Sequence, residues 1–297
     1  MWCSTGRIYY ALQVRNIAVV LAALCSCKSQ SAPPAPVATD LVVVSPGVLP
    51  QRLLRYHLAK GSKSTIELDL EGKLVAGDIK SASPPLTFTL EVRVDDVLAD
   101  GHMKLVSTIQ DLTTHAEAVQ PGAPRAQTDA AALKGVAITS TLAPDGTVTD
   151  VALVGDPKQL GPTAKAEVDQ LVQAMPKLAM PLPATPVGIG AKWRSSRALG
   201  PASPVTLQAV TTIDVTGISG SVVTYEVGST VLGADQVVKQ EGVDVDVKNI
   251  TGTASGRGTF DLQKPALTGT LSAELHMEMT TGSDRTPMAM TLELRTH

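Results

Sequence analysis

The chain has 297 residues with 28 acidic and 25 basic side chains, and its formal net charge is −3 at pH 7. This mild acidity provides no basic surface for nucleic acid, and an aromatic content of 3% argues against stacking platforms for bases or sugars. A chain of this length can bury a large core without disulfides or structural metals.

The first 26 residues have the pattern of a secretory signal. Arg7 and Arg15 are the only charged side chains in this stretch, and residues 17–24 form an uninterrupted apolar run. The run is much shorter than the roughly 20 apolar residues that a membrane-spanning helix needs. We therefore expect residues 1–26 to be removed on export.

The sequence LAALCSCKS at 21–29 resembles the lipobox of bacterial lipoproteins, in which a small residue precedes the lipidated cysteine. Ser26 precedes Cys27, whereas the large Leu24 precedes Cys25. The resemblance implies that Cys27 is the first mature residue and carries the lipid, and that Lys28 after it directs the protein to the outer membrane. No cysteine follows Cys27, so an exported domain offers it no disulfide partner.

The segment after the lipobox is rich in Pro, Ala and Ser, which predicts an extended tether over residues 27–50. Beyond it, several stretches alternate apolar and polar residues with a period of two, as half-buried β-strands do. Turn signals at Gly101, Gly146 and Gly220 separate such stretches. The predicted strands are STIELDL at 64–70, LTFTLEVRV at 86–94, VDVDVK at 243–248, LSAELHMEM at 271–279 and MAMTLELR at 288–295.

The stretch from Thr163 to Lys177 interrupts the β pattern. Val168, Leu171, Val172 and Met175 recur at helical spacing, and a series of prolines follows from position 176. We expect one amphipathic helix followed by an extended proline strap.

The segments on either side of the helix are predicted to be two copies of one unit. KGSKSTIELDL from Lys60 is similar to IGAKWRSSRAL from Ile189, and SPPLTFTLEVRV from Ser83 to ASPVTLQAVTTI from Ala202. Chance similarity between β-rich segments is the alternative. The expected units are a signal at 1–26, the lipidated tether at 27–50, a first β half at 51–158, the helix and strap at 159–185, and a second β half at 186–297.

Long strands with one apolar face must curl around something or pack on something. We therefore expect a mainly β, antiparallel domain whose two related halves form an open or half-closed barrel, with the amphipathic helix across its apolar concavity. The layout is similar to that of lipid-carrier lipoproteins of bacterial envelopes.

Three further motifs resemble a family of uncharacterised bacterial lipoproteins. They are Lys60-Gly61 before the first strands, PVGIGAKW at 186–193, and GTASGRGTFDL at 252–262. The resemblance covers about residues 50–296 and implies a duplicated β-rich domain of unknown function.

The sequence holds no G-x-S-x-G elbow and no phosphate-binding P-loop, and its five histidines are scattered. We therefore expect a protein that is not an enzyme and that needs no cofactor or metal. The richest cluster is HMEMTTGSDRTPMAM at 276–290, where thioether sulfur would suit Cu(I). Strand periodicity turns His276 away from the methionines, which favours adaptable apolar packing or an apolar ligand wall instead. Its residues are Met277, Met279, Met288 and Met290.

Together these features predict a lipid-anchored envelope protein that faces the periplasm or the exterior and binds an apolar small molecule or lipid in its β interior. A structural or protein-interaction lipoprotein with a filled core is the alternative, and Cu(I) binding by the methionine hairpin is a third reading. No nucleic-acid partner is expected, and the oligomeric state stays open.

Overall fold

The structure is a computed structural model. It describes residues 40–82, 85–115, 130–155, 160–161, 164–165, 168–169, 171–172, 175, 179–199, 205–240, 243–265 and 267–297. The elements, in chain order, are β1 (Asp40–Ser45), β2 (Lys63–Ala76), β3 (Ile79–Ala82), β4 (Leu86–Val97), β5 (Met103–Thr114), α2 (Ala130–Leu133), β6 (Ala137–Leu142), β7 (Val148–Val154), β8 (Lys192–Leu199), β9 (Leu207–Ser219), β10 (Val222–Leu232), β11 (Gln236–Gln240), β12 (Val243–Asp261), β13 (Leu267–Thr281) and β14 (Asp284–Thr296).

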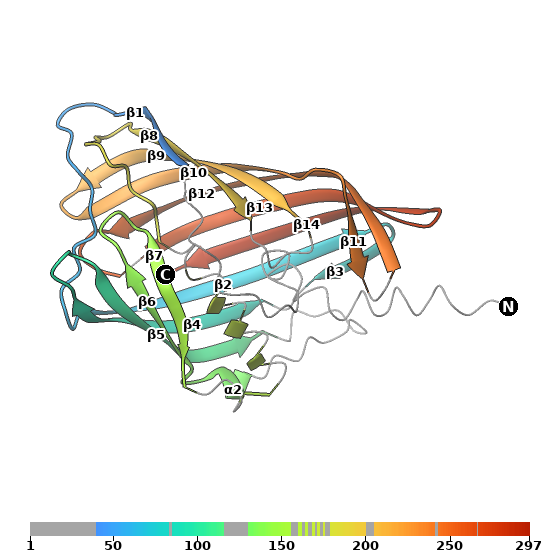
Figure 1. Cartoon of the computed structure of the whole chain (residues 1–297), viewed down its shortest axis with the longest axis horizontal. Helices are drawn as coiled ribbons and strands as arrows, with labels where there is room; N and C mark the ends of the chain where they lie inside the picture. The colour runs from blue at the N-terminus through green and yellow to red at the C-terminus, as the bar shows by residue number, and fades with distance from the viewer. Residues whose placement is uncertain are drawn as a thin grey trace.

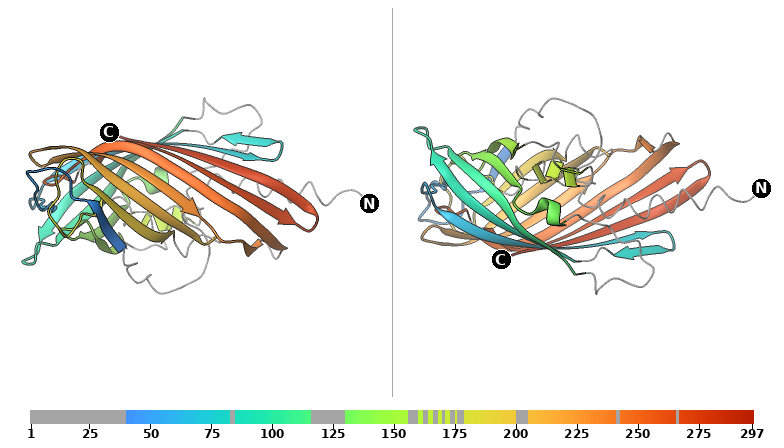
Figure 2. Two further views of the ribbon diagram at one scale, coloured as in Figure 1. Left: turned by 90° about the horizontal axis from the view of Figure 1, so that it is seen from above. Right: turned by 90° about the horizontal axis from the view of Figure 1, so that it is seen from below.

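The strands of the described residues form one 14-stranded antiparallel sheet (Figure 1). Its order is β1-β8-β9-β10-β12-β13-β14-β2-β4-β5-β6-β7, with β3 paired to β2 and β11 to β12. The two ends of this order, β1 and β7, do not pair with each other, so the sheet stays open. Figure 2 shows the sheet curling around a concave side. The predicted mainly β, antiparallel, open-barrel architecture is confirmed.

All five predicted strands lie within strands of the sheet: β2, β4, β12, β13 and β14. The three predicted turns lie between β4 and β5, β6 and β7, and β9 and β10. Their glycines Gly101, Gly146 and Gly220 have φ values of 86°, 87° and 56°. Only glycine adopts this left-handed backbone without steric cost, which explains the residue type at each turn.

Each side of the long connection between β7 and β8 contributes a continuous block of strands. Strands β2 to β7 fill one arm of the sheet, strands β8 to β14 fill the other, and β14 pairs with β2 where the arms meet. In both arms, strands that follow one another along the chain are mostly neighbours in the sheet. This arrangement accommodates the predicted duplication, which itself remains a prediction. Residues 40–45 of the expected tether form β1, which pairs with β8.

Glycines shape the sheet where β12 pairs with β13. A Cβ at Gly252 would lie 2.7 Å from the carbonyl oxygen of Glu274, and one at Gly256 or Gly258 would clash with the carbonyl oxygens of β13. The backbones therefore approach closely because β12 lacks side chains at these inner-face positions. Such glycines let a sheet bend, and the glycine-rich stretch at 252–262 therefore contributes to the curvature of the sheet.

The two arms pack together at one end of the sheet. Trp193 and Val94 are both 0% exposed, and Phe260 is 2% exposed, although they come from β8, β4 and β12. They belong to one cluster that also includes Leu54 and Tyr56 of the β1–β2 connection. This packed end closes one end of the half-barrel and supplies most of its fully buried large side chains.

The described residues of the predicted amphipathic helix lie against the arm formed by β2, β4 and β5. Its described residues Ala164, Lys165, Val168, Asp169, Leu171 and Val172 are helical. Ala164 and Val168 are buried among Leu68, Leu90 and Ile109 of these strands. Lys165 Nζ and Asp169 Oδ2 form an i,i+4 ion pair of 2.5 Å on the exposed side. Figure 2 shows these helical residues and α2 on the concave side of the sheet.

Candidate functional site

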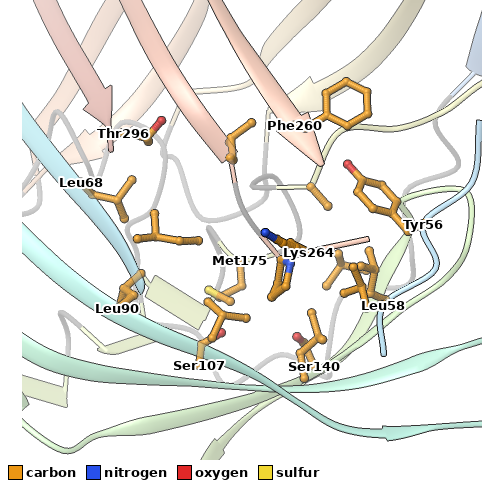
Figure 3. Close-up of a pocket in the computed structure, with 18 residues that line it drawn as sticks. Tyr56, Leu58, Leu68, Leu90, Ser107, Ser140, Met175, Phe260, Lys264 and Thr296 are labelled. Atoms are coloured by element: carbon orange, nitrogen blue, oxygen red, sulfur yellow. The ribbon is translucent and has the colours of Figure 1, made fainter. Parts of the chain in front are cut away.

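A cavity of about 110 Å³ lies between the helix segment and the concave face of the sheet, next to the packed end. Side chains from both arms line it, together with Tyr56 and Leu58 of the β1–β2 connection (Figure 3). Met175 and Ala179 cover it from the helix and strap. The labelled lining residues are Tyr56, Leu58, Leu68, Leu90, Ser107, Ser140, Met175, Phe260, Lys264 and Thr296.

The strand alternation explains why these side chains converge. Leu68 and Leu90 occupy inward-facing positions of β2 and β4, which are adjacent, paired strands of the sheet. Ser107 on β5 and Ser140 on β6 occupy the same inward phase as the leucine and isoleucine two positions before and after each of them. A curled sheet directs all of these positions toward one space.

The cavity wall is apolar apart from a few hydroxyls and one ammonium. Ser107 Oγ is buried and has no hydrogen-bond partner among the described residues. Ser140 is also buried, and Thr296 Oγ1 donates a 3.4 Å hydrogen bond to the Gly269 carbonyl oxygen. Lys264 is exposed and reaches the edge of the cavity (Figure 3). A buried hydroxyl without a partner is costly, so Ser107 favours a polar group or water in this space.

Two aromatic contacts close the cavity toward the packed end. The ring centroids of Tyr56 and Phe260 are 6.0 Å apart, and those of Tyr225 and Phe260 are 5.8 Å apart. Burial raises the pKa of the Tyr56 phenol far above its usual value, against a smaller opposing effect of a hydrogen bond with the Met180 backbone. The phenol therefore stays neutral, and this wall provides apolar surface rather than an acid or base.

The volume limits what the cavity can hold. An engineered protein cavity of about 150 Å³ with an apolar lining binds benzene. At about 110 Å³, this cavity accepts a small apolar group or the end of an alkyl chain, but not a whole lipid. The remainder of a longer ligand would have to lie along the open part of the concave face.

The four methionines lie elsewhere on the sheet. Met277 of β13 is directly opposite Met288 of β14, and Met290 is opposite Leu275. Met277 and Met279 pack against the cluster of Val238, Val245, Val247 and Ile250 near the β11–β12 hairpin. None of the four methionines lines the 110 Å³ cavity. Their role as a ligand wall remains a prediction, now for the open end of the concave face.

The polar residues between these methionines face away from them. His276 Nε2 lies 2.8 Å from Glu274 Oε1 on the outer face, and Glu278 forms an ion pair with Arg285. The hydrogen bond from the Arg285 guanidinium is the main cause that lowers the pKa of Glu278, and the positive charge of Arg285 adds to it. Within the described ranges, no group of three or more His, Cys, Asp or Glu side chains is arranged to hold a metal ion.

Arg197 on β8 is a concave-face residue that the sequence reasoning did not single out. It has the same phase as Trp193 and Ser195, which are 0% and 4% exposed. Its Nε atom is buried and has no hydrogen-bond partner among the described residues. The signal was present in KWRSSRAL, where strict alternation from a buried tryptophan places this arginine inward.

The expected lipidation site, Cys27, lies outside the described residues. Among the residues that the structure does describe, no helix is long and apolar enough to cross a membrane. Comparison of the chain with models of known protein families and with curated proteins finds no match.

Proposed function

We propose that this protein is a non-enzymatic lipoprotein of the bacterial envelope that binds an apolar ligand, such as a lipid, on the concave side of its sheet. In this proposal, acyl chains on Cys27 anchor it to the outer membrane, and the folded part faces the periplasm or the exterior. The observation that carries the binding proposal is the cavity lined by both arms and covered by Met175 and Ala179.

Two features of the concave side support an exchangeable ligand rather than a permanently filled core. Cores of folded proteins are close-packed, so an apolar space of about 110 Å³ leaves its walls without dispersion contacts. Much of the inner face beyond the cavity is also only half-buried, including Leu271, Leu292 and Leu294 on β13 and β14. An apolar chain would cover both surfaces at once.

The alternative of a structural lipoprotein with a filled core has one observation in its favour. The packed end already buries a large apolar cluster around Trp193 and Phe260, which can hold the fold without any ligand. A domain stabilised in this way could present its outer face to a protein partner. Ligand binding therefore has to be measured directly.

Native and denaturing mass spectra of the full chain, exported with Cys27→Ala to avoid detergent, test the proposal. We expect extra mass in the native spectrum that disappears on denaturation and is identified as lipid. Ser140→Leu should lower the bound fraction, because Ser140 lines the cavity and the larger side chain fills part of it.

Thr141→Leu is the matched control, since Thr141 is the next residue of β6 and faces the other side of the sheet. It should leave the bound fraction unchanged. An apo mass that persists after incubation with envelope lipids would refute the binding proposal and favour the structural alternative. Bound copper in place of lipid would instead direct attention to the methionine hairpin.

A further inference from the structure

Arg197 is a concave-face cation for which the described residues provide no counter-charge. The guanidinium makes no ion pair or hydrogen bond with the described residues, and its buried Nε atom has no partner. Burial alone lowers the pKa of Arg197, with no neighbouring charge contributing. Removing a cation from water without pairing it is costly, so such a group is seldom retained without a use.

The described carboxylates of β9 and β10, the strands beside Arg197 on one side, point away from it. Ala209 of β9 is directly opposite Arg197, and Val231 of β10 is opposite Ala209. The acidic residues of these strands, Asp214 and Glu226, have the opposite phase and lie on the outer face, where Asp214 pairs with Lys192 at 2.6 Å. Across β8, β9 and β10, the described concave-face side chains near Arg197 therefore carry no negative charge.

Hydroxyl groups lie next to this arginine on the same face. Ser195 is opposite Thr211, and Thr211 is opposite Ser229, so the three residues form a row across β8, β9 and β10. Thr211 Oγ1 and Ser229 Oγ are 3.1 Å apart and hydrogen-bonded. The row lies two residues along β8 from Arg197, or about 7 Å. Hydroxyl donors beside a guanidinium form a suitable environment for an oxyanion.

The surface between Arg197 and the cavity is lined by small and apolar residues. From Ser229 the row continues through Ala254 of β12 and Ala273 of β13 to Leu292 of β14, next to β2. Six strand spacings separate β8 from β2, which is about 29 Å along the sheet. An alkyl chain can follow this floor from the arginine toward the cavity.

We infer that Arg197, with the hydroxyls of Ser195, Thr211 and Ser229, binds the anionic head group of an amphiphile whose alkyl chain lies on the concave face. The inference rests on the proposed function and adds the ligand class, which is a carboxylate or phosphate ester carrying an apolar chain. Arg197 contributes head-group selectivity, while the apolar wall provides affinity for the chain.

The test compares a fluorescent fatty acid with its uncharged methyl ester, using the full chain with Cys27→Ala. The unsubstituted site should bind the acid about tenfold or more tightly than the ester. Arg197→Gln should abolish this preference and leave ester binding within about twofold. Arg197→Lys should retain part of the preference because it keeps the charge.

Two further variants remove cations that lie away from Arg197. Arg194 is exposed on the outer face of the same strand, and Lys264 lies at the cavity edge. Arg194→Gln should keep the preference for the acid, and Lys264→Gln tests the rival position of the anion site at the cavity edge. Displacement of the probe by oleate or by lysophosphatidylglycerol distinguishes a carboxylate from a phosphodiester head group, and competition by either supports the inference.

The outcomes separate the inference from the function on which it rests. If the acid and the ester bind equally, or if Arg197→Gln keeps the preference, the head-group assignment is wrong and the apolar site stands. If Lys264→Gln removes the preference instead, the anion site is at the cavity edge. If neither probe binds, the proposed function itself fails. Circular dichroism of each variant verifies that the fold is retained.

Discussion

Replacing Gly258 by Ala tests whether missing side chains on β12 produce the curvature of the sheet. A Cβ at this position would clash with the Thr268 carbonyl oxygen and lie 3.1 Å from both Gly269 Cα and Tyr225 Oη. Two of these three atoms belong to the backbone of β13, which cannot rotate away. The variant must therefore push β12 and β13 apart or unbend them.

Gly228→Ala is the matched control. Gly228 lies on the outer face of β10, and an added Cβ would meet no atom within 4 Å. Neither glycine has a positive φ, so both substitutions gain the same stabilisation of about 0.4–1 kcal/mol from a less flexible unfolded chain. Overpacking costs about 1–3 kcal/mol and applies to Gly258 alone. We therefore expect Gly258→Ala to be less stable than Gly228→Ala by about 1–3 kcal/mol.

Urea unfolding followed by the fluorescence of the buried Trp193 gives both free energies of unfolding by linear extrapolation. The comparison requires equal slopes for the two variants, because a changed slope would indicate a change in the exposed surface. Equal stabilities, or a more stable Gly258→Ala, would refute the idea that close backbone approach at β12 bends the sheet.

Three further predictions concern the core, the outer face and the anchor. Trp193→Ala should lower the free energy of unfolding by about 3–5 kcal/mol in urea titrations, because it empties a fully buried position; a loss below 1 kcal/mol would contradict the packing. A hydrogen bond from Thr87, and then one from His297, lowers the pKa of Asp69. The ionised carboxylate therefore stabilises the fold above the unfolded pKa of about 3.9, and this stabilisation is lost as the pH falls through the folded pKa. Asp69→Asn should lose less stability than the unsubstituted protein on acidification below about pH 4, and parallel stability curves would argue against this assignment. Cys27→Ala should move the protein from the membrane fraction to the soluble fraction, whereas release by Cys25→Ala instead would reassign the lipidated residue.

Much of the fold could be predicted because one face of each long strand is buried. In LTFTLEVRV the alternation places Leu90, Val92 and Val94 in the core, and no other local structure accommodates that period. The helical conformation of the described residues from Ala164 to Val172 was predictable for the same reason, since Val168 and its apolar neighbours recur at helical spacing. Short elements such as the four-residue α2 carry too few residues for any period to be recognised.

Long-range pairing could not be predicted from these local patterns. Nothing in MAMTLELR specifies that β14 pairs with β2 rather than with β9, because the choice depends on the closure of both arms. β12 adds a second difficulty at Asn249, whose φ of 53° accompanies a shift of register against β13. The extra residue keeps Val247 and Ile250 on the same face, although their spacing in the sequence suggests opposite faces.

The candidate site was only partly predictable for the same reason. The inward phase of the methionines follows from the alternation, but their distance from the cavity depends on which end of the sheet each hairpin reaches. Arg197 was overlooked because one polar residue in an apolar phase is hard to distinguish from an exposed one until Trp193 is known to be buried. Following the alternation of side chains along each strand from a buried aromatic residue would have identified Arg197 as inward-facing.

β8 shows how the same strand can serve stability and binding separately. Trp193 and Arg197 share a face and lie four residues apart, or about 13 Å along the strand. Trp193 is enclosed by both arms at the packed end, so its loss should lower the stability of the core. Arg197 faces the open concavity, and its Nε atom has no hydrogen-bond partner among the described residues. Replacing an unpaired, half-buried cation removes a desolvation cost, so Arg197→Gln should leave stability unchanged or raise it. A site whose residues cost stability while the fold is held elsewhere can change its ligand preference without unfolding the protein.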